Sequence, residues 1–352
     1  MILEEPFGEV GGRPARAFRL DGGAGVTARL TDYGARLTEL HVPGRDGQTA
    51  DIVLGFDDAQ SYLTFPAYFG ATVGRYGNRI RRGQFTLLGR DYQVDGNEKG
   101  NHLHGGRHGW DSRLWDVQAG EDDHSITFRT ASADGEMGYP GACVVSSTYR
   151  LDGMRLQITM EVVPDATTII NMVHHSYFNL AGHGSGTVLP QEMRIAGDFY
   201  TPVDDELLPT GEILTVAGTP LDFRQRHRIG LHLDGLGPVG TAIFDGGSGW
   251  DHNWCLGLPG QDGLIEAAEI HDPASGRTLR CRSTEPGLQM YIGGYLHDGI
   301  VGKGGNRYCK YAGFTLETQK FPDSPRFGHF PTTMVRAGET YRHVMVLDLS
   351  VD

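Results

Sequence analysis

Two adjacent histidines, His174 and His175, stand in a segment of strand-forming residues from Ile169 to Gly182. An imidazole gains and loses a proton near neutral pH, so either residue could act in acid–base catalysis, and a structural histidine is the ordinary alternative. In a strand, successive side chains point to opposite faces. His174 then shares its face with apolar residues, which predicts a place in the core or behind a site. His175 shares the other face with Asn171 and Tyr177, which favours a polar cleft.

A carboxylate has a similar setting near the end of the chain, in a predicted strand from Gly313 to Gln319. Phe314 and Leu316 face one way, and Glu317 projects from the polar face. A carboxylate that takes a proton while an imidazole gives one is a pairing that acid–base catalysis can use. Most glutamates are solvated, so a solvated carboxylate at a sheet edge is the alternative.

Other segments carry groups that suit a hydroxyl-rich ligand. Gly70 to Ile80 combines glycines, which let backbone approach a ligand, with the donors of Asn78 and Arg79. The alternative is a glycine-rich turn with a solvated arginine. Asp251 could bind sugar hydroxyls or cap a turn. Two tryptophans shortly after His104, at 110 and 115, could stack on a sugar ring or belong to the core, which is the commoner outcome.

His102 and His104 have the spacing of an H-x-H metal motif. Both side chains would lie on one side of a strand. The acidic residue expected a few positions later is missing, because Arg107 and His108 stand there. We therefore predict no metal ion at this pair.

The elements that must position these groups are predicted to be strands. The 52 glycines are scattered without a period, which suggests many tight turns between short strands. Strand-like runs at 125–130, 143–151, 156–163 and 168–177 have the spacing of an antiparallel meander. A short helix is predicted at 57–62. No linker, repeat or shift in composition divides the chain, which predicts one domain over residues 1–352.

Composition narrows the range of partners. The formal net charge of −13 disfavours binding to nucleic acids and anionic membranes, which relies on clustered Lys and Arg. The four cysteines are far apart and are predicted to be free thiols: Cys143, Cys255, Cys281 and Cys309. There is no run of about 18 apolar residues and no secretory signal pattern, so we expect a cytoplasmic protein.

Seven motifs, in order along nearly the whole chain, resemble those of the aldose 1-epimerases, the galactose mutarotases. The motifs are Gly74 to Ile80, His102 to Gly106, His175 to Gly182, Thr201 to Val203, Leu221 to Phe223, Asp251 to Trp254 and Leu316 to Gln319. The resemblance implies a large antiparallel β-sandwich with few short helices, a sugar cleft on its concave face, no cofactor, and interconversion of the α and β anomers of free aldoses. It implies that Glu317 is the general base and His175 the general acid. The substrate-binding groups that it implies are Asn78, Arg79, His104, Asp251 and Gln289.

That reaction suits these residue types. Mutarotation takes a proton from the anomeric hydroxyl and gives one to the ring oxygen, so one carboxylate and one imidazolium suffice. A nearby carboxylate is expected to raise the pKa of His175 and favour its charged form. One departure from the family pattern is visible, because His174 stands where the family usually has Asn.

Three other functions fit parts of the pattern. Asp251 and Glu317 could be the paired carboxylates of a glycoside hydrolase. The chain could be a non-catalytic carbohydrate-binding module, although the presence of both His175 and Glu317 argues against it. An epimerase of sugar phosphates would need several Lys or Arg around the cleft, and only Arg79 stands in a matched motif. The expected partner is a small monosaccharide, bound by a monomer or a homodimer.

Overall fold

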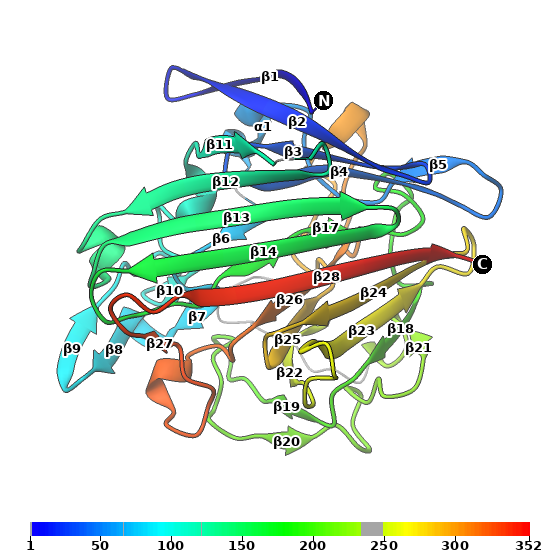
Figure 1. Ribbon diagram of the computed structural model, residues 1–352. Helices are drawn as coiled ribbons and strands as arrows, with labels where there is room; N and C mark the ends of the chain where they lie inside the picture. Colours follow the sequence, from blue (N-terminus) through cyan, green and yellow to red (C-terminus); the bar gives the residue numbers. More distant parts are fainter. Residues whose placement is uncertain (1, 66, 121, 234–248) are drawn as a thin grey trace.

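The computed structural model describes residues 2–65, 67–120, 122–233 and 249–352, and most of its regular structure is antiparallel strand (Figure 1). The α-helix among them is α1 (Ala59–Thr64), close to the predicted helix at 57–62. The Asp58 side chain caps it by accepting a hydrogen bond from the Ser61 amide at 2.8 Å. Short 3-10 turns are η1 (Arg81–Gly83), η2 (Trp110–Ser112), η3 (Glu136–Gly138), η5 (Lys303–Gly305) and η6 (Ser324–Arg326). The all-β prediction is confirmed.

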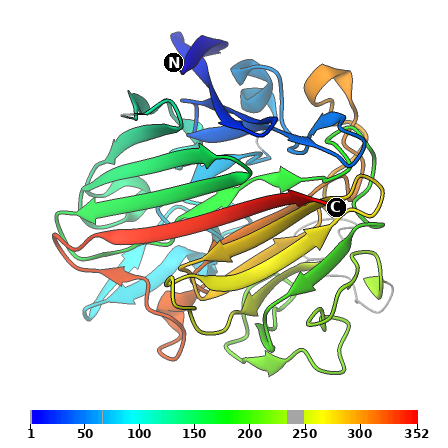
Figure 2. The same ribbon diagram turned by 45° about the vertical axis from the view of Figure 1, so that its right-hand side comes forward.

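The largest sheet has nine strands. Their order is β11 (Asp116–Ala119), β12 (Ser125–Ser132), β13 (Cys143–Asp152), β14 (Arg155–Pro164), β28 (Tyr341–Val351), β24 (Arg277–Ser283), β23 (Ile265–His271), β18 (Glu192–Ile195) and β21 (His227–Arg228). The last strand of the chain, β28, lies in the middle of this sheet and is red in Figure 2. The three predicted strands at 125–130, 143–151 and 156–163 are confirmed as β12, β13 and β14.

A second sheet, of six strands, carries three of the seven predicted site residues: Asp251, Gln289 and Glu317. Its order is β17 (Tyr177–Phe178), β26 (Phe314–Gln319), β25 (Gly287–Tyr291), β22 (Asp251–Cys255), β19 (Phe199–Thr201) and β20 (Leu214–Thr215). A five-stranded meander lies at the top of Figure 1: β1 (Leu3–Val10), β2 (Arg13–Gly23), β3 (Val26–Thr31), β4 (Arg36–Pro43) and β5 (Thr49–Asp51). Four strand pairs complete the fold: β6 (Ala71–Val73) with β16 (Val173–His175), β7 (Arg79–Ile80) with β10 (His102–Leu103), β8 (Gln84–Leu87) with β9 (Arg90–Gln93), and β15 (Thr168–Ile169) with β27 (Met334–Val335).

The core lies between the two large sheets. Leu288 from β25 and Leu316 from β26 share one buried cluster with Ile158 and Met160 from β14. Trp110 and Trp115 belong to the same cluster, so the core reading of both is confirmed. Because alternate side chains of β25 and β26 point into this cluster, the residues between them face away from it, toward a second, polar surface. The one-domain organisation stays a prediction, supported by a core that joins residues from Phe18 to Leu349.

The predicted single strand at 168–177 is wrong in one respect, because it is three short strands. β15 pairs with β27, β16 with β6, and β17 with β26. The chain passes from one neighbour to the next as it crosses the molecule, so no single ladder continues along it. The predicted alternation holds from His174 to Tyr177, and it is this part that positions the catalytic candidate. Among the described residues, none of the helices has the length and apolar character needed to span a bilayer.

Candidate active site

A cavity of about 430 Å³ lies on the polar face of the six-stranded sheet. Its polar lining residues are Asn78, Arg79, Glu98, His104, His175, Asp251, His297 and Glu317, and its apolar and aromatic wall includes Phe65, Tyr68, Tyr177, Tyr291, Tyr295, Leu296 and Ile300. Six of the seven predicted site residues therefore share one cavity. A concave site with an apolar wall and a few convergent polar groups is the usual form of a small-molecule site.

A larger hollow, of about 560 Å³, lies beside the β8–β9 hairpin. The described residues that line it include one carboxylate, Asp91, and no histidine. It therefore lacks the acid–base pair that the smaller cavity contains, and we assign the chemistry to the smaller one.

Strand register explains how residues far apart in sequence meet. Glu317 of β26 is paired with Gln289 of β25, and Asp251 of β22 is paired with Tyr291 of β25. Paired positions in adjacent strands have their side chains on the same face of a sheet. Tyr177 of β17 is paired with Thr315, two residues before Glu317, which brings the His175 segment to the same face.

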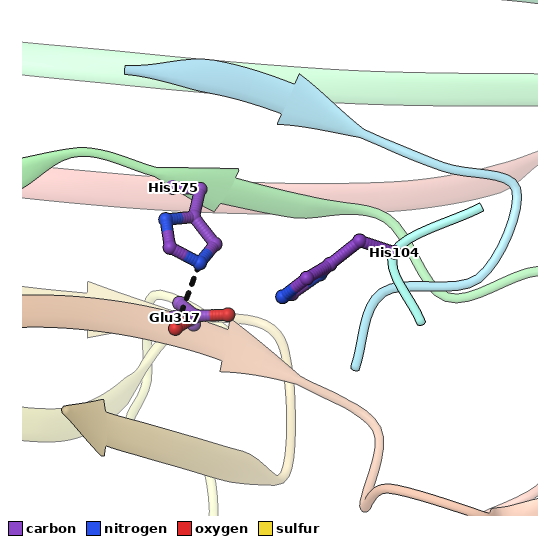
Figure 3. Close-up of side chains that lie close together, drawn as sticks. All are labelled: His104, His175 and Glu317. Atoms are coloured by element: carbon purple, nitrogen blue, oxygen red, sulfur yellow. Dashed lines mark ion pairs between the residues drawn. The ribbon is translucent and has the colours of Figure 1, made fainter. Parts of the chain in front are cut away.

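His175 and Glu317 form a close, buried pair at the centre of the cavity. Nε2 of His175 lies 3.4 Å from Oε1 of Glu317 (Figure 3). Thr315 donates a hydrogen bond to the same carboxylate oxygen at 2.9 Å. Both residues are nearly inaccessible, at 4% and 3% exposure, so a solvated Glu317 is excluded. Among the described residues, Nδ1 of His175 and Oε2 of Glu317 have no hydrogen-bond partner, and such buried polar atoms are available to a bound ligand.

Burial controls the protonation of this pair. It raises the pKa of Glu317, and the negative charge of Asp251 raises it further. Burial lowers the pKa of His175. The expectation that a neighbouring carboxylate raises the pKa of His175 is therefore wrong, because a carboxyl group that keeps its proton offers no charge to stabilise an imidazolium. Near neutral pH, the pair holds one proton and one basic lone pair.

His104 enters the cavity alone, without His102. It follows β10 with φ at +50°, and its ring points toward the Glu317 carboxylate (Figure 3). His102 instead hydrogen-bonds the Asp95 carbonyl oxygen at 2.7 Å and the Tyr139 hydroxyl. The expectation that the two histidines lie on one side of a strand is wrong, because β10 ends at Leu103.

Asn78 determines which nitrogen of His104 carries the hydrogen. The backbone N–H of Asn78 donates to Nδ1 of His104 at 3.2 Å, so that nitrogen has no hydrogen of its own. Burial lowers the pKa of His104 well below its usual value, so the ring is neutral. A neutral imidazole with a bare Nδ1 carries its hydrogen on Nε2. His104 is thus a hydrogen-bond donor toward the cavity.

Arg79 is fixed by a residue that sequence reasoning missed. Its Nε and Nη2 donate to the two carboxylate oxygens of Glu98 at 2.6 and 2.7 Å. Burial, the largest single influence, acts to lower the pKa of Arg79, but the charge and hydrogen bonds of Glu98, together with the charge of Asp251, outweigh it and the net shift is upward. Arg79 is buried, so the solvated-arginine alternative is wrong. Glu98 gave no sequence signal, because its segment from Asp95 to Gly100 is typical of a polar turn.

Gln289 is the predicted site residue that the structure places next to the cavity wall. Its Nε2 donates to Oδ1 of Asp251 at 2.6 Å. It is absent from the described residues that line the cavity. Burial raises the pKa of Asp251, and the hydrogen bond from Gln289 acts in the opposite direction. Gln289 therefore fixes the position of the Asp251 side chain. A direct contact between Gln289 and the substrate stays a prediction.

Tyr68 is another residue that the sequence did not indicate. Its ring centre lies 4.7 Å from that of His104 and 5.6 Å from that of His175. Its φ of +58° is unusual for a tyrosine, and such backbone conformations are found at functional sites. No motif marks this conformation, because the sequence around Tyr68 has no turn signal at that residue.

Three potential ligand atoms, from His104, His175 and Glu317, lie within 4.8 Å of one another. The tautomer of His104 opposes a metal ion there, because Nδ1 accepts a hydrogen bond and Nε2 carries a hydrogen. Only two ligands remain, fewer than the three or four protein ligands of a typical zinc site. Both observations support the prediction that the site uses no metal ion, which stays a prediction.

A second close group, Glu39, His41 and Asp51, also needs a different explanation from metal binding. Arg29 pairs with Glu39, and Lys303 pairs with Asp51. These cations already neutralise the carboxylates, which disfavours a further metal ion.

Comparison with known proteins decides the family. A family model described as Aldose 1-epimerase matches residues 16–348. The chain belongs to the aldose 1-epimerase family. It is 40% identical over 352 residues to a galactose mutarotase of Rattus norvegicus, covering 99% of each chain. It is 33% identical over 347 residues to an aldose 1-epimerase of Escherichia coli K12, covering 97% of each. A solved galactose 1-epimerase of Lactobacillus acidophilus NCFM is similar with a TM-score of 0.85 and 26% identity, covering 100% of this chain and 99% of that chain.

His174, the departure from the usual family pattern, lies behind the cavity of this epimerase. Its Nε2 is 2.7 Å from the Ser176 hydroxyl, and its Nδ1 is 3.3 Å from the Tyr149 hydroxyl. The prediction that the two histidines face opposite ways is confirmed by these contacts. An imidazole in place of an amide at this position is accommodated by the two hydroxyl groups.

Proposed function

We propose that this cavity interconverts the α and β anomers of free aldoses, with Glu317 as the general base and His175 as the general acid. The observation that carries the proposal is the buried pair separated by 3.4 Å, whose unpartnered atoms face a cavity of monosaccharide size. The isomerase activity itself follows from membership of the aldose 1-epimerase family. The similarity of the chain to mutarotases and aldose 1-epimerases favours neither a glycoside hydrolase nor a binding module.

The reaction moves two protons and returns both. The Glu317 carboxylate takes the proton of the anomeric hydroxyl while His175 gives a proton to the ring oxygen, and the ring C1–O5 bond breaks to leave an aldehyde. Rotation about C1–C2 and reclosure give the other anomer, and the two protons return to their donors. The free site reaches this state by one proton transfer from Glu317 to His175. Sugar hydroxyls that donate to the carboxylate favour that transfer, because hydrogen bonds stabilise the charged form.

The other polar groups suit recognition of a sugar ring. Arg79 and the Nε2–H of His104 donate hydrogen bonds, Asn78 can donate or accept, and Asp251, held by Gln289, accepts them. The aromatic wall suits the apolar C–H face of a pyranose. We infer that these residues orient the sugar so that O1 and O5 meet the pair.

Polarimetry on freshly dissolved α-D-galactose, α-D-glucose and pentoses tests the proposal. We expect the protein to accelerate the approach to the equilibrium rotation for at least one of these sugars. No acceleration with any of them would contradict the proposal. Release of reducing sugar from a glycoside would instead support a hydrolase, and a preference for hexose phosphates would support the sugar-phosphate alternative.

The partner, the location in the cell and the oligomeric state complete the proposal. The family implies a monosaccharide as the small-molecule partner. The cytoplasmic location and the monomeric or homodimeric state stay predictions, which cell fractionation and light scattering would test.

A further inference from the structure

We propose that Glu98 determines which sugars the cavity accepts by neutralising Arg79, so that sugars with an anionic substituent are excluded. This inference rests on the proposed function, because it concerns the same cavity. It goes beyond that function by giving a specificity role to a residue outside the acid–base pair.

The geometry of the Arg79–Glu98 pair supports a fixed, complete neutralisation. The two side chains are joined by two hydrogen bonds of 2.6 and 2.7 Å, one to each carboxylate oxygen. Their side chains are 7% and 9% exposed, so solvent screens the pair weakly. A two-point contact of this kind fixes the plane of the guanidinium as well as its position.

Among the described residues that line the cavity, acidic groups outnumber the Lys and Arg side chains. Arg79 is the one Lys or Arg side chain among the described residues that line it, beside the histidines His104, His175 and His297, whereas Glu98, Asp251 and Glu317 are acids. Asp251 accepts a hydrogen bond from the neutral amide of Gln289. A carboxylate or phosphate on the sugar would leave water, come near the acidic groups of Glu98 and Asp251, and find the guanidinium of Arg79 already paired. Placing like charges together in such a site is unfavourable.

A pair of ligands with the same shape separates charge from size. A hexuronic acid and its primary amide differ mainly in the negative charge at neutral pH, and both can be tested as inhibitors of the interconversion of a neutral aldose. For the wild-type protein, we expect the amide to bind at least about tenfold more tightly than the acid, because only the acid brings a like charge. Equal binding of the two would overturn the proposal, even if the neutral aldose is converted normally.

Two substitutions of Glu98 then separate its charge from its geometry. Glu98→Gln keeps the shape and removes the charge, so we expect the ratio between amide and acid to fall toward one. Glu98→Asp keeps the charge and shortens the side chain, so we expect the ratio to stay near that of the wild type while kcat/KM for the neutral sugar falls. A shift of the same size in both variants would overturn the proposal, as would an unchanged ratio in folded Glu98→Gln.

Glu206→Gln is the matched control. Glu206 pairs at 3.0 Å with Arg82, which is three residues after Arg79, and neither Glu206 nor Arg82 is among the described residues that line the cavity. We expect this variant to keep both the activity and the ratio of the wild type. If Glu98→Gln does not fold, the wild-type ratio and Glu98→Asp still decide: a wild-type ratio near one, or a ratio lost in Glu98→Asp, contradicts the proposal. Failure of the proposed function would appear separately, as no conversion of any neutral aldose by the wild type.

Discussion

The two faces of the segment from Val173 to Tyr177 are equally buried, but their histidine side chains differ in how many of their ring nitrogens have hydrogen-bond partners. On the back face, both ring nitrogens of His174 have hydroxyl partners, in Tyr149 and Ser176. On the cavity face, Nδ1 of His175 has no hydrogen-bond partner in the part of the chain that the structure describes. The two histidines are 1% and 4% exposed, so burial does not distinguish them. The difference lies in hydrogen bonding: the satisfied histidine stabilises the fold, and the unsatisfied one is available for chemistry.

Strand β26 repeats the same division. Glu317 faces the cavity with a free carboxylate oxygen, whereas the hydroxyl of the next residue, Thr318, lies 2.8 Å from Nε2 of His343 behind the sheet. Nδ1 of His343 in turn meets the carbonyl oxygen of Met172 at 3.2 Å. The back layer is therefore a set of closed hydrogen bonds that joins the strands carrying His175 and Glu317. This arrangement lets the cavity face hold unpaired polar groups in fixed positions.

The largest expected effect comes from removing either proton carrier on the cavity face. Glu317→Gln and His175→Asn should each lower kcat/KM by roughly 10² to 10⁴, the usual loss when a positioned acid or base is removed. Polarimetry with the best substrate measures it. Thr318→Val is the matched control, because it changes the neighbouring residue on the back face and should leave the rate within a factor of about three. Equal losses of kcat/KM in Thr318→Val and Glu317→Gln would contradict the assignment of the chemistry to the cavity face alone.

The next effect is on stability and its dependence on pH. The folded-state pKa of Glu317 is raised above its unfolded value, so the folded protein binds more protons than the unfolded chain in the interval between the two. Stability from this group is thus full below the ordinary value of about 4.3 and is lost as pH rises toward the raised value. Glu317→Gln cannot ionise. The melting temperature of the Glu317→Gln variant, relative to that of the wild type, should therefore increase as pH rises through this interval.

Activity should follow the same protons. A bell-shaped profile of kcat/KM is expected, since the pair works with one shared proton. The acid limb should lie below the ordinary histidine range, because burial lowers the pKa of His175, and the basic limb should lie above the ordinary glutamate range. A melting difference between Glu317→Gln and wild type that does not change with pH would contradict the assignment of a raised pKa.

Much of this site could be predicted from the sequence because it depends on alternation along strands. The faces of His174, His175 and Glu317 follow from a period of two, and the family motifs indicate most of the cavity residues. The division of 168–177 into three strands could not be predicted, since each part changes partner through contacts distant in sequence. Glu98 was missed because a carboxylate in a polar turn is ordinary until its arginine is placed beside it. Protonation was misjudged because burial, which sequence does not give, dominates it.

A smaller effect is expected on the back face, from His174→Asn. Asn is the residue that the family usually has there, and its amide can meet one or both hydroxyls of Tyr149 and Ser176. We expect a loss of about 1 kcal/mol in the free energy of unfolding, typical of one weakened hydrogen bond, and a change in kcat/KM of less than about threefold. Denaturant unfolding and polarimetry measure the two. A crippled His174→Asn beside a mildly affected His175→Asn would show that the faces are assigned the wrong way round.

The smallest expected effect is that of metal removal, which should be none. The cavity face holds His104, His175 and Glu317 close enough to suggest a divalent ion, so this treatment tests whether the free atoms there await a metal or a sugar. His104 cannot serve as a ligand without losing the hydrogen bond from the Asn78 amide or moving its hydrogen from Nε2, which leaves two ligands. Treatment with EDTA followed by dialysis should therefore leave kcat/KM unchanged, and added Zn²⁺ should not raise it. Activity that is lost on chelation and restored by one divalent ion would mean that the imidazole of His104 takes the other tautomer, and that the unpaired atoms of the cavity face belong to a metal centre.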